Sequence, residues 1–287
     1  MQSTQLRGLL SMIAAVATFA VMDMCMKRLV EVYPAMQVTF LRAAASLPFL
    51  LLGTALFGRF RDLIPKRFVL HVVRGCLAVM TLWFFVYAVQ FLSLADTYAI
   101  FMSAPLLITA LSVPVLREQV GWRRWLAVIV GMIGVLVVLK PSGTGLITLG
   151  GLAALTSAVG YALSALTIRV LLRTDSGAAT VFWSLLFVTL VSGTIASFQW
   201  VSLQWQHWQW ILAVGLAGAV GQYLITHAFR LAAAATLAPI EYTALIWGMI
   251  FDYVLWATIP GARMLFGAAI IVASGMYVIY RERARDK

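Results

Sequence analysis

Long apolar runs alternate with short polar breaks along the whole chain. Each run is continuous and reaches roughly the 20 residues that a helix needs to cross a bilayer. A transmembrane β-barrel would instead show alternating segments of about ten residues, so the pattern excludes one. It predicts an all-α integral membrane protein with ten spans, near residues 6–28, 34–57, 67–90, 94–116, 122–140, 146–170, 178–200, 207–230, 234–257 and 263–280.

Composition strengthens this interpretation. The 287 residues are 63% hydrophobic and 11% charged. A soluble domain has about 45–50% apolar and about 25% charged residues, so a soluble enzyme and a disordered chain are both excluded. Ten spans with short connections use the full length and leave no room for a soluble domain.

The net charge of +11 predicts an orientation. In a soluble protein it would suggest nucleic acid, but in a membrane protein it indicates Lys- and Arg-rich cytoplasmic loops, so we expect no nucleic-acid partner. With a cytoplasmic N-terminus, fifteen of the 21 Lys and Arg residues fall on the inner side and four on the outer side. Arg42 and Arg74 fall within spans. We therefore predict a bacterial-type inner-membrane protein with both termini in the cytoplasm.

The two halves of the chain repeat each other. At an offset of 140, Tyr87-Ala88 falls on His227-Ala228 and Ile100 falls on Ile240. The halves, residues 1–141 and 142–287, hold five spans each, so the second enters the membrane from the opposite face. Inverted repeats with a midplane site between them are a common transporter plan, in which rocking exposes the site alternately. The alternative is an old duplication in a structural protein.

Two stretches resemble the EamA repeat of the drug/metabolite transporter superfamily. They run from Pro105 to Pro141 and from Pro239 to the Tyr280-Arg-Glu-Arg segment, and the resemblance extends over about residues 6–281. It implies two inverted five-helix halves and a central cavity lined mainly by the first four helices of each half. Glu118 matches the acidic residue that closes a helix in this family, whereas the second half has Trp256-Ala257-Thr258 there.

Charged side chains at bilayer depth are costly and are therefore functional candidates. Asp23 and Lys27 are spaced i, i+4, which predicts either a self-satisfied pair at a helix end or a free Asp23 that contacts Arg42. Arg42 lies about 12 Å below the outer end of its helix, at 1.5 Å per residue. An anchoring role and a substrate-binding role remain open for it.

A second set of charges lies nearer the inner side. Arg74 and Glu241 have matching depths, roughly 10 Å from that side. Glu241 is a candidate for proton coupling; the alternative is a fixed Arg74–Glu241 pair that only holds two helices together. Asp252 shares a helix face with Glu241 at i+11 and is either a further candidate or a residue that snorkels to water. Pro105 and Pro239 interrupt two helices and could free carbonyl groups there.

Aromatic and polar residues occupy two symmetry-related helix faces. Trp83 and Tyr87 fall on Tyr223 and His227 at the offset of 140. Such faces suit planar or cationic substrates, although packing between helices is an equal alternative. His227 is either a proton relay or a hydrogen-bonded structural residue. A strip of Gly215, Gly218 and Gly221 on the same helix permits close approach of another backbone. The predicted substrate pathway contains Trp83, Tyr87, Tyr98, Tyr223, His227, Tyr242 and Trp247.

These features predict a secondary-active transporter of small organic metabolites that works by alternating access. We expect export of amino-acid-like or drug-like solutes, with protons as the candidate coupling ion; the alternative is uptake of a vitamin or nucleoside-like metabolite. No nucleotide-binding loop, metal-ligand spacing or catalytic motif occurs, so we expect no cofactor, no metal and no enzymatic activity. An intramembrane enzyme and a structural or signalling membrane protein are the rival classes. The expected partners are a small-molecule substrate and the lipid bilayer, with the chain a monomer or homodimer.

Overall fold

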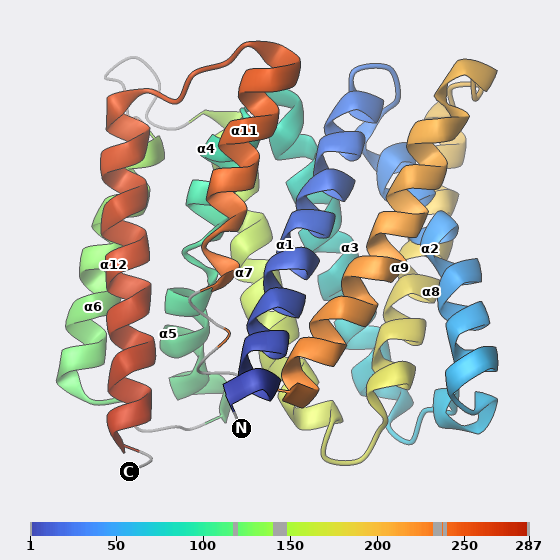
Figure 1. Ribbon diagram of the computed structural model, residues 1–287. Helices are drawn as coiled ribbons and strands as arrows, with labels where there is room; N and C mark the ends of the chain where they lie inside the picture. Colours follow the sequence, from blue (N-terminus) through green and yellow to red (C-terminus); the bar gives the residue numbers. More distant parts are fainter. Residues whose placement is uncertain (1, 117–119, 140–147, 232–236, 238–239, 286–287) are drawn as a thin grey trace.

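The computed structural model describes residues 2–116, 120–139, 148–231, 237 and 240–285 (Figure 1). Glu118 and Pro239, which the sequence analysis singled out, lie outside this range. The long helices are α1 (Gln2–Val30), α2 (Ala35–Phe57), α3 (Phe68–Phe91), α4 (Leu94–Phe101), α5 (Ala104–Leu116), α6 (Trp122–Leu139), α7 (Leu149–Leu171), α8 (Gly177–Ala196), α9 (Trp208–Leu231), α11 (Ala244–Trp256) and α12 (Ala262–Arg285). The short 3-10 turns are η1 (Phe60–Leu63), η2 (Ser197–Gln199) and η3 (Trp205–His207).

The helices confirm the predicted spans. In the described part of the chain, nine helical segments are long and apolar enough to cross a membrane, and α11 is a shorter apolar helix. Helices α4 and α5 together make one crossing, Leu94–Val115. The predicted span 34–57 corresponds to α2 and the predicted span 122–140 to α6. The protein is therefore an all-helical, multi-pass membrane protein.

Short polar residues mark where several helices begin. The hydroxyl groups of Ser93, Thr148 and Ser176 accept hydrogen bonds from backbone N–H groups in the first turns of α4, α7 and α8. These bonds satisfy donors that an α-helix leaves without intrahelical partners. Inside the spans, hydroxyl groups such as those of Thr39 and Thr54 donate to the carbonyl four residues earlier, which removes the cost of an unpaired hydroxyl in an apolar medium.

The helices pack in pairs that join the two halves of the chain. Helix α1 packs against α9, α3 against α7, α2 against α8, and α6 against α12. Figure 1 shows both termini at the same end of the bundle, with α6 and α12 together at one side of it. We call this end the termini end, and the other the far end.

Helix α9 approaches α1 and α2 closely through its glycines. A Cβ atom added at Gly215 would stand 2.6 Å from the carbonyl oxygen of Ala45 in α2. One added at Gly221 would stand 3.0 Å from the ring of Phe19 in α1. The glycine strip on this helix therefore serves the close packing that the sequence predicted.

Two helix breaks occur at equivalent places. Helix α4 ends at Phe101 and α5 begins at Ala104, with the turn at Met102-Ser103 between them. The chain makes a similar turn at Tyr242-Thr243, directly before α11. The two turns are separated by 140 residues, the offset at which the sequence repeats. Pro105 lies in the first turn of α5, where a proline needs no N–H partner.

A polar cluster joins two connections at the termini end. Asp175 Oδ1 accepts hydrogen bonds from the Lys66 N–H at 2.6 Å and from His71 Nε2 at 3.2 Å, and Oδ2 accepts from the Thr174 hydroxyl at 2.6 Å. Burial opposes ionisation of Asp175, but these bonds outweigh it and lower the pKa of the carboxyl to about 2. The cluster thus ties the α2–α3 connection to the α7–α8 connection.

Candidate functional site

A cavity of about 780 Å³ lies in the centre of the bundle. Its lining comes from α1, α2, α3, α4, α7, α8 and α9, together with Glu241 and Ala244. No described residue of α6 or α12 contributes. The volume falls in the range of about 300–1,000 Å³ that is typical of small-molecule sites. The first four helices of each half therefore form it, as the family resemblance implied.

The cavity is open toward one end of the bundle. Its lining includes Gly58, Arg59 and Asp62 in the connection between α2 and α3, at the termini end. Toward the far end the lining stops at the level of Asp23 and Tyr98. We call this inner limit the blind end. The lining is rich in charge and in rings, with three acidic and three basic side chains: Asp23, Arg42, Arg59, Asp62, Arg74 and Glu241.

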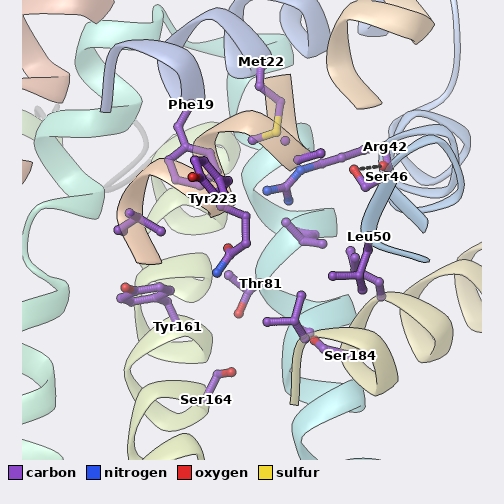
Figure 2. Close-up of a pocket in the computed structure, with 18 of the residues that line it drawn as sticks. Phe19, Met22, Arg42, Ser46, Leu50, Thr81, Tyr161, Ser164, Ser184 and Tyr223 are labelled. Carbon is purple, nitrogen blue, oxygen red and sulfur yellow. Dashed lines mark hydrogen bonds between the residues drawn. The ribbon is translucent and has the colours of Figure 1, made fainter. Parts of the chain in front are cut away.

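Arg42 and Asp23 carry opposite charges at the blind end. Figure 2 shows the guanidinium of Arg42 extending from α2 into the cavity. The two charges interact through space, yet among the described residues they form no direct ion pair. Asp23 instead accepts a hydrogen bond from the Tyr98 hydroxyl at 2.7 Å. Gly248 of α11 makes room for the Tyr98 ring, because a Cβ there would stand 2.7 Å from it.

Arg74 and Glu241 both line the cavity but are not paired. The guanidinium of Arg74 donates to the carbonyl oxygen of Thr180 in α8. Within the described ranges no ion pair joins it to Glu241, so the fixed Arg74–Glu241 pair expected as an alternative is not present. Glu241 lies within electrostatic reach of the Tyr161 and Tyr242 hydroxyls. A carboxyl group that faces the cavity is accessible to protons from the aqueous side.

Three levels of contact close the bundle from the blind end toward the far end. At the first, Asp23 of α1 accepts from Tyr98 of α4. At the second, Lys27 Nζ lies 2.7 Å from Asp252 Oδ1 of α11. At the third, Trp256 Nε1–H donates to Glu31 Oε1 at 2.7 Å.

We call these three levels the barrier. Asp23 and Lys27 lie four residues apart on one face of α1, and Glu31 follows directly after Val30, the last residue of that helix. Lys27 Nζ and the Arg28 guanidinium also lie 4.4 and 4.7 Å from the centroid of the Trp256 ring. On the far side of the barrier is a second hollow of about 320 Å³, lined in part by Lys27, Glu31 and Trp256.

The barrier corrects two expectations about charges. Lys27 does not pair with Asp23 in its own helix, because Asp252 reaches it from α11. Asp252 does not snorkel to water, since it is 1% exposed. Its two oxygens also accept the backbone N–H groups of Leu94 at 3.0 Å and Ala95 at 2.7 Å, at the N-terminus of α4. A helix N-terminus favours an anion, so Asp252 joins α1, α4 and α11.

Three of the aromatic and imidazole residues expected along the substrate pathway line the cavity. They are Tyr98, Tyr223 and His227. The rings of Tyr223 and His227 stack with centroids 6.1 Å apart and an interplanar angle of 15°. His227 Nδ1 is 3.2 Å from the Ser11 hydroxyl of α1. Tyr223 and His227 of α9, which the sequence match with α3 singled out, thus both line the cavity.

The other four lie outside the lining. Trp83 and Tyr87 pack against buried apolar clusters, and their rings contact Phe84 and Phe91. The cavity face of α3 carries Arg74, Ala78, Thr81, Leu82 and Phe85 instead. Tyr242 packs against Gly275 of α12, and Trp247 stacks on Phe251. The face of α3 was misjudged because nearly every position of this helix is apolar, so periodicity does not separate the cavity from lipid or core.

Several lining residues were missed by sequence reasoning. Tyr161 and Ser164 of α7 line the cavity (Figure 2). The ring of Tyr161 packs against the ring of Phe101, with their centroids 5.2 Å apart. Ser157, Tyr161 and Ser164 are spaced i, i+4 and i+7, so a polar stripe on this span was a signal. Thr81 and Ser184 also lie around the cavity and left no comparable pattern.

Comparison with known families gives one match over both halves of the chain. The sequence model described as the EamA-like transporter family matches residues 6–140 and again residues 148–281. The matched segments contain the cavity helices and the barrier residues.

Individual relatives are transporters with different named solutes. The chain is 25% identical to an S-adenosylmethionine uptake transporter of Rickettsia prowazekii, over 98% of this chain and 95% of the relative. It is 26% identical to a riboflavin transporter of Vibrio cholerae, over 98% and 96%. It is also 26% identical to a pseudopaline exporter of Pseudomonas aeruginosa, over 93% and 94%.

The fold also has a counterpart among solved structures. A crystal structure with 17% sequence identity superposes with a TM-score of 0.64, over 100% of this chain and 99% of the other. At this identity the likeness concerns the fold alone.

Proposed function

The chain belongs to the EamA-like transporter family, and we propose that it is a secondary-active transporter that carries small organic metabolites across the membrane by alternating access. One observation carries the proposal. The central cavity reaches the termini end and is blocked from the far end by the barrier. This is the arrangement of one stage of an alternating-access cycle, in which a solute binds from one side only.

The second stage requires the two halves of the chain to move against each other. We assign the halves to residues 1–141 and 142–287, related by inversion in the membrane. The packing of α1 on α9 and of α3 on α7 supports this. In each pair, the first helix of one half packs against the third helix of the other half, as expected for two equivalent halves. Rocking of the halves would part the barrier and close the termini end.

The orientation follows from charge. Exposed cations, among them Arg59, Arg61 and Arg123, lie near the termini end. We propose that this end is cytoplasmic, so that the cavity opens to the cytoplasm. A cavity open to the cytoplasm suits loading for export of amino-acid-like or drug-like solutes. Uptake of a vitamin or nucleoside-like metabolite is the second candidate, and the names of the Rickettsia and Vibrio relatives support it.

Glu241 is the proposed proton-coupling group. It faces the cavity and has no ion-pair partner among the described residues, so it can gain and lose a proton as the cavity is exposed to each side in turn. The barrier acid Asp252 is unsuited to this role because it is held by Lys27 and by two backbone N–H groups.

Transport itself is tested by flux. Purified protein is screened for thermal stabilisation by metabolites, because a ligand that binds the native state raises apparent stability. The stabilising solutes are then followed by counterflow in proteoliposomes. Ser184→Trp, which fills the cavity, should abolish flux, whereas the matched Ser184→Ala should retain it. Equal flux through both variants would contradict a route through this cavity.

Coupling is tested separately with Glu241→Gln, which keeps the shape of the side chain and removes its titration. The variant should fold and exchange solute across the membrane, yet lose accumulation driven by a pH gradient. Full gradient-driven accumulation would remove Glu241 from the coupling mechanism and leave the transport proposal intact.

A further inference from the structure

The chemistry of the blind end specifies a class of solute. Building on the proposed transport function, we infer that this end binds a zwitterionic head group, with Arg42 holding a carboxylate and Asp23 holding the adjacent cationic group. Arg42 would then determine specificity, because a solute without a carboxylate leaves its guanidinium unsatisfied. The assignment rests on how each charged group of the lining is engaged.

The guanidinium of Arg42 is the unengaged cation deep in the cavity. Within the described residues no hydrogen bond or direct ion pair involves it, and it points into open space (Figure 2). The Ser46 hydroxyl next to it donates its hydrogen to the backbone carbonyl of Arg42, and no hydrogen bond from the guanidinium to this hydroxyl is present in the described part of the chain. An isolated charge removed from bulk water is costly. A ligand carboxylate, bound by the planar fork of the guanidinium, would remove that cost.

The other basic residues of the lining are differently placed. Arg74 is bound to the carbonyl of Thr180, which fixes its guanidinium against α8. Arg59 is exposed at the mouth, where water already solvates it. Among the lining cations that the structure describes, Arg42 is the deep one whose guanidinium makes no hydrogen bond, whereas Arg74 makes one, although its Nε has no partner. Arg74 provides a matched control, since it has the same charge in the same cavity.

The Asp23 carboxylate favours a zwitterionic solute over a purely anionic one. Its Oδ2 is held by Tyr98, whereas no described residue donates to its other oxygen, and it interacts electrostatically with Arg42. A purely anionic solute at Arg42 would be repelled by this carboxylate and by Glu241. A head group that carries an ammonium or similar cation beside its carboxylate satisfies both partners.

The rest of the cavity accommodates a larger, partly apolar body. Around the head-group position the lining includes the rings of Phe85, Phe101, Tyr161 and Tyr223. Rings of this kind bind planar groups through stacking. A cavity of about 780 Å³ exceeds what a small amino acid fills, so the solute carries a ring or an extended chain beyond its head group.

The first experiment compares ligands that differ in one charged group, all on wild-type protein. Phenylalanine is compared with 3-phenylpropionate, which lacks the ammonium, and with phenethylamine, which lacks the carboxylate. S-adenosylmethionine is compared with its decarboxylated form, and riboflavin is the ligand without a carboxylate. Binding is measured by thermal shift and by competition, and flux by counterflow. At least one of the two zwitterions should stabilise wild-type protein, and its decarboxylated partner should bind at least about tenfold more weakly.

Substitutions then locate the effect. Arg42→Gln should abolish the advantage of the carboxylate, Arg42→Lys should restore part of it, and Arg74→Gln should leave it unchanged. If Arg42→Gln does not fold, the ligand pairs on wild-type protein together with Arg42→Lys still decide the matter. Asp23→Asn should reduce the preference for phenylalanine over 3-phenylpropionate.

The outcomes separate this inference from the transport proposal. Failure of both zwitterions to stabilise wild-type protein overturns the inference, as does equal binding of the decarboxylated partners. If riboflavin or phenethylamine is carried and Arg42→Gln carries it equally well, transport stands and the inference falls. If carboxylates bind through Arg42 and no solute of any kind is carried, the inference stands and transport falls.

Discussion

Replacement of Asp252 by asparagine would break the central level of the barrier while keeping the shape of the side chain. Lys27 Nζ lies 2.7 Å from Asp252 Oδ1, and the two side chains are 11% and 1% exposed. Removing one partner of a buried pair leaves an uncompensated charge, which costs about 3–5 kcal/mol. We therefore expect Asp252→Asn to shift the equilibrium away from the closed barrier by about two to four orders of magnitude.

The assay measures access to the blind end from each face of the membrane. Ser46→Cys places a thiol in the cavity lining, on a background in which Cys25 and Cys76 are alanine. In oriented vesicles an impermeant maleimide should label this thiol from the termini end only. With Asp252→Asn, labelling from the far end should appear, and the melting temperature should fall if the closed form is the most stable one.

A second substitution tests the reasoning. Lys27→Met removes the orphaned ammonium, and replacing both members of a buried pair by neutral groups is often neutral or stabilising. Adding Lys27→Met to Asp252→Asn should therefore recover most of the one-sided labelling. If the double variant is as open as Asp252→Asn, or more so, the orphaned charge is not the cause and the explanation is refuted.

Three further outcomes follow from local geometry. Ala257 ends α11 with φ 51° and ψ 27°, a left-handed conformation that glycine adopts without strain. Ala257→Gly should therefore raise the free energy of unfolding, measured with denaturant, by about 0.5–1 kcal/mol. The pKa of Asp175 is lowered from 3.8 to about 2 in the folded protein, so its contribution to folding stability is present above about pH 4 and is lost as pH falls toward 2. Thermal scans across this pH window should show a loss of stability of at most about 2 kcal/mol that is absent in Asp175→Asn. Gly215→Val places a side chain against the Ala45 carbonyl and should destabilise the α2–α9 contact by about 1–3 kcal/mol, whereas Gly53→Val, with no atom within 4 Å of its Cβ, should be nearly neutral.

The spans could be predicted from sequence because hydrocarbon imposes a length and an apolar composition on every crossing. The α4–α5 crossing follows the predicted span 94–116, and its interruption follows from Pro105. The central cavity was expected from the resemblance to a transporter family. These features depend on local composition and on the order of segments, both of which are present in the chain itself.

Partners across helices could not be predicted in the same way. Spacing placed Asp23 and Lys27 on one face of α1, which was right, but it did not show that Tyr98 and Asp252 reach them from other helices. Trp83 and Tyr87 were assigned to the cavity from their match to Tyr223 and His227. The rotation of an almost uniformly apolar helix about its axis leaves little trace in the sequence, so the match did not show which face of α3 lines the cavity. Lipid and protein interior are equally apolar, so hydrophobic periodicity does not distinguish them.

The spacing of the barrier residues along α1 has a consequence for leakage. Asp23, Lys27 and Glu31 act in series, so a solute or ion passes only when all three levels are open at once. Transient loss of one contact leaves two intact, and the probability of a continuous path is the product of three separate openings. A rigid rotation of α1 would release the Asp23 and Lys27 contacts together, because they share one face, and Glu31 follows directly after the last residue of the helix. The same helix thus resists random fluctuation while responding to a concerted motion, which allows a gradient to be maintained between turnovers.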